Sequence, residues 1–143
     1  MKTGIAIFAN GSAIEPANDS VRAVTRAFAA AGGFELVEAA FLELGQPPLA
    51  AAVERLIAGG AGRIVVVPYF LTLGKHLQRD LPRIVSEISK THNGIPITVT
   101  APLDGHPAML TALLDRAREA GARVRDLGVD RTRPPAGDIA GER

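Results

Sequence analysis

The chain has 143 residues, no cysteine and a formal net charge of +1. This length fits one domain with a real core, and the lack of cysteine excludes disulfides, zinc–thiolate sites and thiol catalysis. The near-neutral charge gives no reason to expect a nucleic-acid partner, and no apolar run is long enough to predict a membrane span. The sequence starts without the layout of a signal peptide, so we expect a cytoplasmic protein.

Short apolar runs alternate with segments of helical periodicity. The apolar runs predict strands at residues 5–8, 34–41, 63–67 and 97–100. Helical spacing predicts helices at residues 16–31, after Pro47-Pro48, around residues 81–88 with Pro82 tolerated near the helix start, and after Pro107. Such alternation predicts an α/β fold in which helices cover both faces of a four-stranded parallel sheet.

The alternating pattern fails after Ala122. Residues 123–143 mix charges of both signs with Pro134-Pro135 and include no aromatic residue. Because this composition offers no apolar face to bury, we predict one domain over residues 1–122 followed by a disordered C-terminal tail.

Four loops follow the carboxyl ends of the predicted strands, which is where open α/β sheets place their ligand sites. The first loop carries Asn10, the second Glu43 and the fourth His106. The third runs from Pro68 to His76 and is the most informative. It joins apolar side chains to an imidazole, which suits a flat and partly apolar ligand.

The polar residues of these loops also have purely structural interpretations. Glu43 fits a solvated loop carboxylate, and His76 fits the first turn of the third helix. His106 precedes Pro107 and fits a residue that orients the fourth loop through a hydrogen bond. These alternatives stay open at the level of sequence.

The turn and the cations beside these residues are equally ambiguous. Gly11-Ser12 is typical of a tight turn with a helix-capping hydroxyl, and the functional alternative is an anion site at a helix N-terminus. Lys75 and Arg79 are either solvated charges or partners for the carboxylates of a ligand.

Taken together, these segments resemble the small class II chelatases, the sirohydrochlorin cobaltochelatase and ferrochelatase group of CbiX and SirB type. The resemblance extends over about residues 3–120. It rests on Gly11-Ser12, residues 40–44, residues 65–68 with Phe70-Leu71 and Gly74-Lys75-His76, residues 80–82 and residues 102–107.

The resemblance implies a three-layer chelatase-like fold, often paired as a homodimer. It implies insertion of a divalent metal substrate (Co²⁺, Fe²⁺ or Ni²⁺) into sirohydrochlorin for cobalamin or siroheme biosynthesis, without an organic cofactor, nucleic acid or membrane as a partner. His76 and Glu43 would bind the metal and remove the pyrrolic protons. The residues expected to contact the macrocycle are Asn10, Gly11, Ser12, Phe70, Leu73 and Lys75.

The chain departs from the family pattern at Asn10, where the family typically carries histidine before Gly-Ser. A carboxamide is neither a base nor a good ligand for these metals, and loss of a general base costs about 10²–10⁴ in rate. We favour an active chelatase in which His76 serves as ligand and base. The alternatives are a non-catalytic tetrapyrrole- or metal-binding protein and, without the resemblance, a small α/β module for an anionic metabolite.

Overall fold

The structure, a computed structural model, describes residues 1–122, so the predicted tail at residues 123–143 lies outside the described residues. Residues 1–104 and the described residues that follow, 105–122, belong to two separate units, and each is described by itself. The elements are β1 (Lys2–Ala9), α1 (Glu15–Gly32), β2 (Val37–Phe41), α2 (Leu49–Ala58), β3 (Ala61–Pro68), α3 (Lys75–Thr91), β4 (Ile97–Val99) and α4 (Pro107–Glu119).

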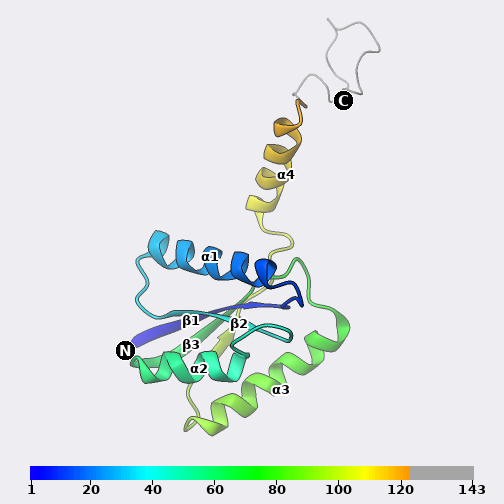
Figure 1. The fold of residues 1–143 in the computed structure, drawn as a ribbon. Helices are drawn as coiled ribbons and strands as arrows, with labels where there is room; N and C mark the ends of the chain where they lie inside the picture. The colour runs from blue at the N-terminus through cyan, green and yellow to red at the C-terminus, as the bar shows by residue number, and fades with distance from the viewer. Residues whose placement is uncertain (123–143) are drawn as a thin grey trace, which may run out of the picture. The chain divides into compact units, whose positions relative to one another are not determined.

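The four strands form one parallel sheet in the order β2-β1-β3-β4. Helix α1 lies on one face of this sheet, and α2 and α3 lie on the other (Figure 1). Strand β1 is buried from Gly4 to Ala9 without alternation, as expected for a central strand that has both faces covered. The predicted fold class is therefore confirmed.

The core is divided by the sheet into a large and a small cluster. Alternate residues of β1 and β3, including Phe8, Ile64 and Val66, pack against α2 and α3 on one face. On the other face Phe41 and its neighbours in the small cluster pack against Val21 of α1. The larger cluster holds α2 and α3 against the sheet. It therefore fixes the positions of the loops that join β2 to α2 and β3 to α3.

Two predicted details differ from the structure. The second strand begins at Val37, because Phe34 closes the C-terminal turn of α1: its N–H donates to the carbonyl of Ala29 and its ring stacks on Phe28 at 5.2 Å. Pro82 lies well inside α3 and not near its start. The helix tolerates it at the cost of the hydrogen bond that its missing N–H cannot form.

Helix α4 belongs to the second unit. His106 caps it, because Nδ1 of this histidine accepts a hydrogen bond from the N–H of Ala108 at 3.0 Å. The helix buries no residue, and Leu110 and Leu113 are 63% and 67% exposed. None of the helices within residues 1–122 combines the length and hydrophobicity that crossing a membrane requires.

Candidate functional site

The loops after the parallel strands leave one edge of the sheet, here called the rim. The loops after β1 and β2 are joined there by backbone hydrogen bonds: the N–H of Leu42 donates to Ala9 at 2.9 Å and that of Glu43 to Asn10 at 3.0 Å. Since β1 lies between β2 and β3, the loop of Asn10 lies between the loop of Glu43 and the segment that leads to His76. Residue 10 is thus central in the rim.

Gly11 lets the first two rim loops pack against each other. Its φ is +93°, and a Cβ added there would collide with the carbonyl oxygen of Glu43. Only glycine combines this backbone conformation with so close an approach. The structure thus shows why glycine stands at residue 11, although residues 10–12 form no hydrogen-bonded turn of the predicted kind.

The predicted helix-capping role of Ser12 is wrong. The N-cap of α1 is Ile14, and no side chain caps this helix. The hydroxyl of Ser12 instead accepts a hydrogen bond from the N–H of Ile14 at 3.0 Å, which stabilises the loop before the helix begins.

A residue that the sequence reasoning missed fastens these loops to α1. Asn18 is 1% exposed and forms hydrogen bonds with Ser12 of the first loop and Leu44 of the second. A signal was present, because residues 18, 21 and 25 share one helical face and an asparagine on a face that also carries Val21 must find buried partners.

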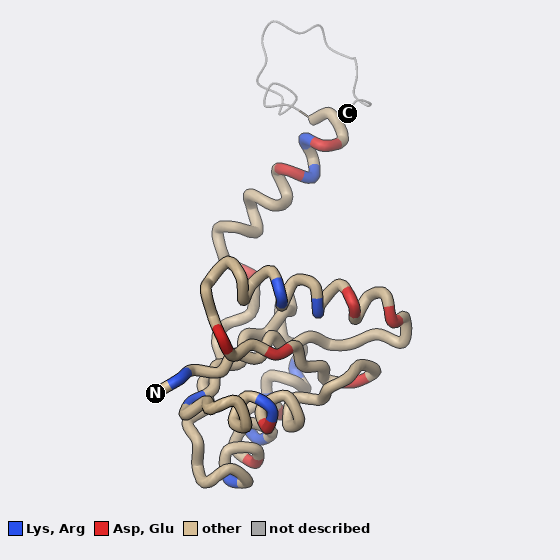
Figure 2. The backbone as a smooth tube through the Cα atoms, turned by 60° about the vertical axis from the view of Figure 1, so that its left-hand side comes forward, with Lys and Arg blue, Asp and Glu red and all other residues tan. Residues whose placement is uncertain are grey.

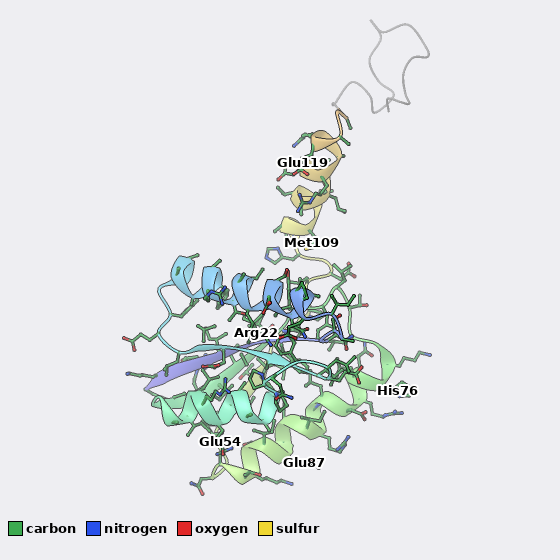
Figure 3. All side chains as sticks on the ribbon, in the orientation of Figure 1. Arg22, Glu54, His76, Glu87, Met109 and Glu119 are labelled. Carbon is green, nitrogen blue, oxygen red and sulfur yellow. The ribbon has the colours of Figure 1, made fainter. Side chains whose placement is uncertain are left out.

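His76 is the second residue of α3, and its side chain lies near the start of that helix (Figure 3). Its Nδ1 lies 2.9 Å from Nη2 of Arg79. A guanidinium can only donate, so Nδ1 accepts and the proton of the neutral ring is on Nε2. A metal can bind His76 only if Arg79 releases Nδ1, because a ring protonated on Nδ1 would place two donors against each other.

Positive charge gathers at the start of α3. Lys75 is the first residue of this helix, and no side chain caps the helix at Gly74. The uncapped N–H groups add to the charges of Lys75 and Arg79. This end of α3 is therefore suited to carboxylates.

Apolar side chains of the rim divide into packed and exposed ones. Phe70 and Leu73, which the sequence selected, are half-buried against the core, and the ring of Phe70 lies 5.8 Å from that of Phe8. Whether they contact a ligand stays a prediction. The side chains that stand out from the same three loops are Ile14, Leu42, Leu44, Tyr69 and Leu71, which are 38–67% exposed.

No three-ligand metal centre is preformed in the described part of the chain. Within residues 1–122 no group of three or more histidines, cysteines, aspartates or glutamates could hold a metal ion. His106 caps α4, which confirms its structural interpretation. The assignment of His76 and Glu43 as metal ligands stays a prediction.

Two hollows are lined mainly by residues outside the rim, although Leu42 of the second rim loop lines the first. One of about 340 Å³ is lined by α2, α3 and the ends of β1 and β2, and it is mostly apolar. The other, of about 270 Å³, lies along β2 beside Arg22, Arg26 and Arg55. Neither is lined by Asn10, Glu43 or His76.

The sequence profile of the CbiX family matches residues 4–120. The chain belongs to the CbiX family. It is 32% identical over 121 residues to the chloroplastic sirohydrochlorin ferrochelatase of Arabidopsis thaliana, a match that covers 85% of this chain and 54% of that protein. It is 37% identical over 92 residues to the sirohydrochlorin cobaltochelatase of Saccharolobus solfataricus, covering 60% and 72%. The CbiX chain thus spans about half the length of the plant relative.

Solved structures of the CbiX and SirB type share the fold. A CbiX protein of Marinobacter aquaeolei VT8 superposes with a TM-score of 0.72 at 26% identity, covering 82% of this chain and 95% of that one. The sirohydrochlorin chelatase SirB of Bacillus subtilis subspecies spizizenii, in complex with cobalt, gives 0.77 at 25% identity and covers 83% and 51%. Family membership removes the premise of the anionic-metabolite module, which set the resemblance aside.

Proposed function

We propose that this CbiX-family chain is a sirohydrochlorin chelatase that inserts Co²⁺ or Fe²⁺ as its metal substrate. The single observation that supports this best is the composition of the rim. Three neighbouring loops present exposed apolar side chains beside a carboxylate, an imidazole and the positive N-terminus of α3. A flat macrocycle with an acidic periphery matches such a surface, and relatives of the chain carry the names of sirohydrochlorin chelatases.

The proposal gives each rim residue a chemical role. The exposed apolar side chains contact the face of the macrocycle, and Lys75 and Arg79 pair with its carboxylates. Insertion of a divalent metal releases two pyrrolic protons, for which Glu43 and His76 are the acceptors. An imidazole and a carboxylate also form a mixed N/O site suited to Co²⁺ and Fe²⁺.

Carboxylate binding and metal binding are linked through Arg79. This arginine occupies Nδ1 of His76 in the structure. A carboxylate of the macrocycle competes for the same guanidinium, and its binding therefore frees the imidazole. The macrocycle would in this way prepare His76 to accept the metal or a proton.

A second candidate function, a non-catalytic tetrapyrrole-binding protein of the same family, is supported by Asn10 and by the lack of a three-ligand cluster in residues 1–122. Visible absorption spectra of the protein with sirohydrochlorin, before and after addition of Co²⁺, separate the two. A spectral change on mixing followed by rapid metallation supports the chelatase. Binding with metallation no faster than in buffer supports the binding protein, and no change on mixing contradicts both.

We also propose that two copies associate. The chain covers 95% of the Marinobacter protein but only 51% of the SirB chain, so two copies would supply the length of one SirB chain. The exposed leucines of α4 offer an apolar stripe for this contact. Light scattering should show a dimer that Leu110→Asp/Leu113→Asp dissociates and that Thr111→Asp/Ala112→Asp, off the stripe, leaves intact. The cytoplasmic location stays a prediction.

A further inference from the structure

Asn18 joins two rim loops from inside the protein. Its Oδ1 accepts the N–H of Ser12 at 2.9 Å, and its Nδ2 donates to the carbonyls of Ser12 at 2.9 Å and Leu44 at 3.0 Å. Because Oδ1 meets a donor and Nδ2 meets acceptors, only this orientation of the amide satisfies its neighbours. A single side chain thus fastens the loop after β1 to the loop after β2.

Two hydrogen bonds hold the backbone at Glu43, and one of them comes from Asn18. The N–H of Glu43 donates to Asn10 at 3.0 Å, and the carbonyl of the next residue, Leu44, accepts from Asn18. Leu44 has a φ of +57°, a conformation that a leucine adopts only where the surroundings enforce it. The backbone of Glu43 is therefore fixed on both sides, whereas its side chain is exposed at the rim.

Charged neighbours on α1 extend this arrangement. Nδ2 of Asn18 also lies 2.9 Å from Oε1 of Glu15, so its two N–H groups are shared among three acceptors, and Glu15 pairs with Arg22 at 2.9 Å. Arg22 in turn donates to the carbonyl of Gln46 at 2.9 Å and lies over the ring of Phe41 at 5.2 Å. The second rim loop is thus held to α1 at two points, one on each side of Gly45. Figure 2 shows the acidic residues of α1 before its basic ones along the helix.

We propose that Asn18 is a positioning residue for metal insertion, because it holds the loop that carries Glu43 in place relative to residue 10 and so sets the position from which the carboxylate reaches out. This inference rests on the proposed function. Asn18 is 1% exposed and does not contact the macrocycle itself. Displacing a reacting group by about 1 Å can cost about 100-fold in rate, whereas the macrocycle is also bound by Tyr69, Leu71 and the cations of α3, which Asn18 does not hold. Loss of Asn18 should therefore lower kcat far more than it raises KM.

The first test is the near-isosteric Asn18→Asp variant, which keeps an acceptor for Ser12 and loses the donors to Leu44 and Glu15. We expect kcat for metal insertion to fall about 10- to 100-fold, with KM for sirohydrochlorin nearly unchanged. The matched control is Thr25→Val. Thr25 is the other buried polar residue of α1, and its hydroxyl bonds only Val21, at 2.8 Å. This control should lower stability and leave kcat unchanged.

The second test asks whether Asn18 acts through Glu43. Asn18→Asp is combined with Glu43→Gln in a double-mutant cycle. If Asn18 positions the carboxylate, the double variant should be no more than about 2-fold slower than Glu43→Gln alone, because the group to be positioned is already gone. A full additional loss in the double variant would overturn the proposal and leave Asn18 as a general stabilising residue.

The third test does not depend on turnover. Hydrogen exchange of the Glu43 amide, which bonds Asn10, should become at least about 10-fold faster in Asn18→Asp, while that of Ile7 inside β1 should not change. Equal exchange of the Glu43 amide in both proteins would overturn the positioning role. If the wild-type protein fails to metallate sirohydrochlorin, the proposed function fails, and the exchange result alone decides whether Asn18 holds Glu43.

Discussion

The two sides of the rim are built differently. The loops after β1 and β2 share backbone hydrogen bonds, the close contact at Gly11 and the buried amide of Asn18. The segment after β3 has one hydrogen bond from the N–H of Tyr69 to Phe8 and two bonds to the fourth loop, and the side chain of His76 contacts only the exposed Arg79. The backbone that carries Glu43 is therefore preorganised, whereas His76 must change partner before it can act.

This contrast matters because a fixed group and an adaptable group contribute to catalysis in different ways. A carboxylate held in place costs no reorganisation when charge develops, and its effect appears in kcat. An imidazole that must leave Arg79 couples its availability to a ligand. The proposed chelatase thus combines one acceptor carried by a fixed loop with one that the substrate releases.

The largest expected effect tests His76, the residue that must change partner. His76→Ala removes both a metal ligand and a base, so specific Co²⁺ binding should be lost and metal insertion should fall by at least about 10²–10⁴. His92→Ala is the matched control, since it removes an imidazole from the opposite end of α3. Calorimetry with Co²⁺ measures the binding. Unchanged affinity in His76→Ala would move the metal site elsewhere, with His106 the next residue to test.

Restoring the family histidine at residue 10 tests the loops after β1 and β2, which carry Asn10 and Glu43. Residue 10 lies on the fixed loop beside Glu43, so Asn10→His should raise the rate of insertion by up to about 10²–10⁴, the effect of one well-placed base. Asn10→Ala should change the rate only slightly. A wild-type rate that is already high, with no gain from Asn10→His, would mean that His76 or another base removes the protons. Binding of metal and macrocycle by Asn10→His without turnover would favour the binding-protein alternative.

Adding a side chain at Gly11 should disrupt the contact between the loops after β1 and β2. Gly11→Ala places a methyl group against the carbonyl of Glu43, whereas Gly33→Ala introduces a side chain at a similar positive φ with no neighbour within 4 Å. The strain at Gly33 should cost about 1–2 kcal/mol, and the collision at Gly11 should add about 1–3 kcal/mol. Urea unfolding of both variants measures the difference. Equal losses would show that the loops separate without cost.

The cations at the start of α3 should affect affinity more modestly. Lys75→Ala/Arg79→Ala should weaken sirohydrochlorin binding about 10-fold at low ionic strength and less at high salt, where charges are screened. Arg83→Ala/Lys90→Ala removes the same charge further along α3 and serves as the control. A loss of the same size in both double variants would indicate a long-range effect of net charge and no local carboxylate site.

The smallest expected effect concerns Glu15, which bonds Asn18 and Arg22 on α1. The hydrogen bond from Asn18, and next that from Arg22, hold the pKa of Glu15 below its usual value. The resulting stabilisation is complete above the unfolded pKa of about 4.3 and is lost as pH falls through the lower folded pKa. Wild type should therefore be more stable than Glu15→Gln at pH 7, and this gap should narrow by pH 3 in thermal unfolding. A constant gap would contradict the assignment.

Much of the fold could be predicted because local periodicity carries it. Runs such as residues 63–67 and the stripe around Leu81 and Ile88 identified strands and helices in the right order, and parallel strands then place their following loops at one edge. Phe34 was misassigned to a strand, because the turn that ends α1 depends on its stacking on Phe28. The family resemblance added the identity of the rim residues, which periodicity alone does not reveal.

The sequence by itself determined the α/β order and the family, since both rest on short local patterns that recur in a fixed order along the chain. The need for glycine at residue 11 became clear only from the tertiary structure, where the loop of Glu43 packs against it. Only the tertiary structure decided which rim side chains are exposed and which are packed. Phe70 faces Phe8 while Leu71, one residue on, is 61% exposed, and Asn18 is buried because two loops from different strands close over it. Burial and hydrogen-bond partners are set by segments distant in sequence, so no local pattern specifies them.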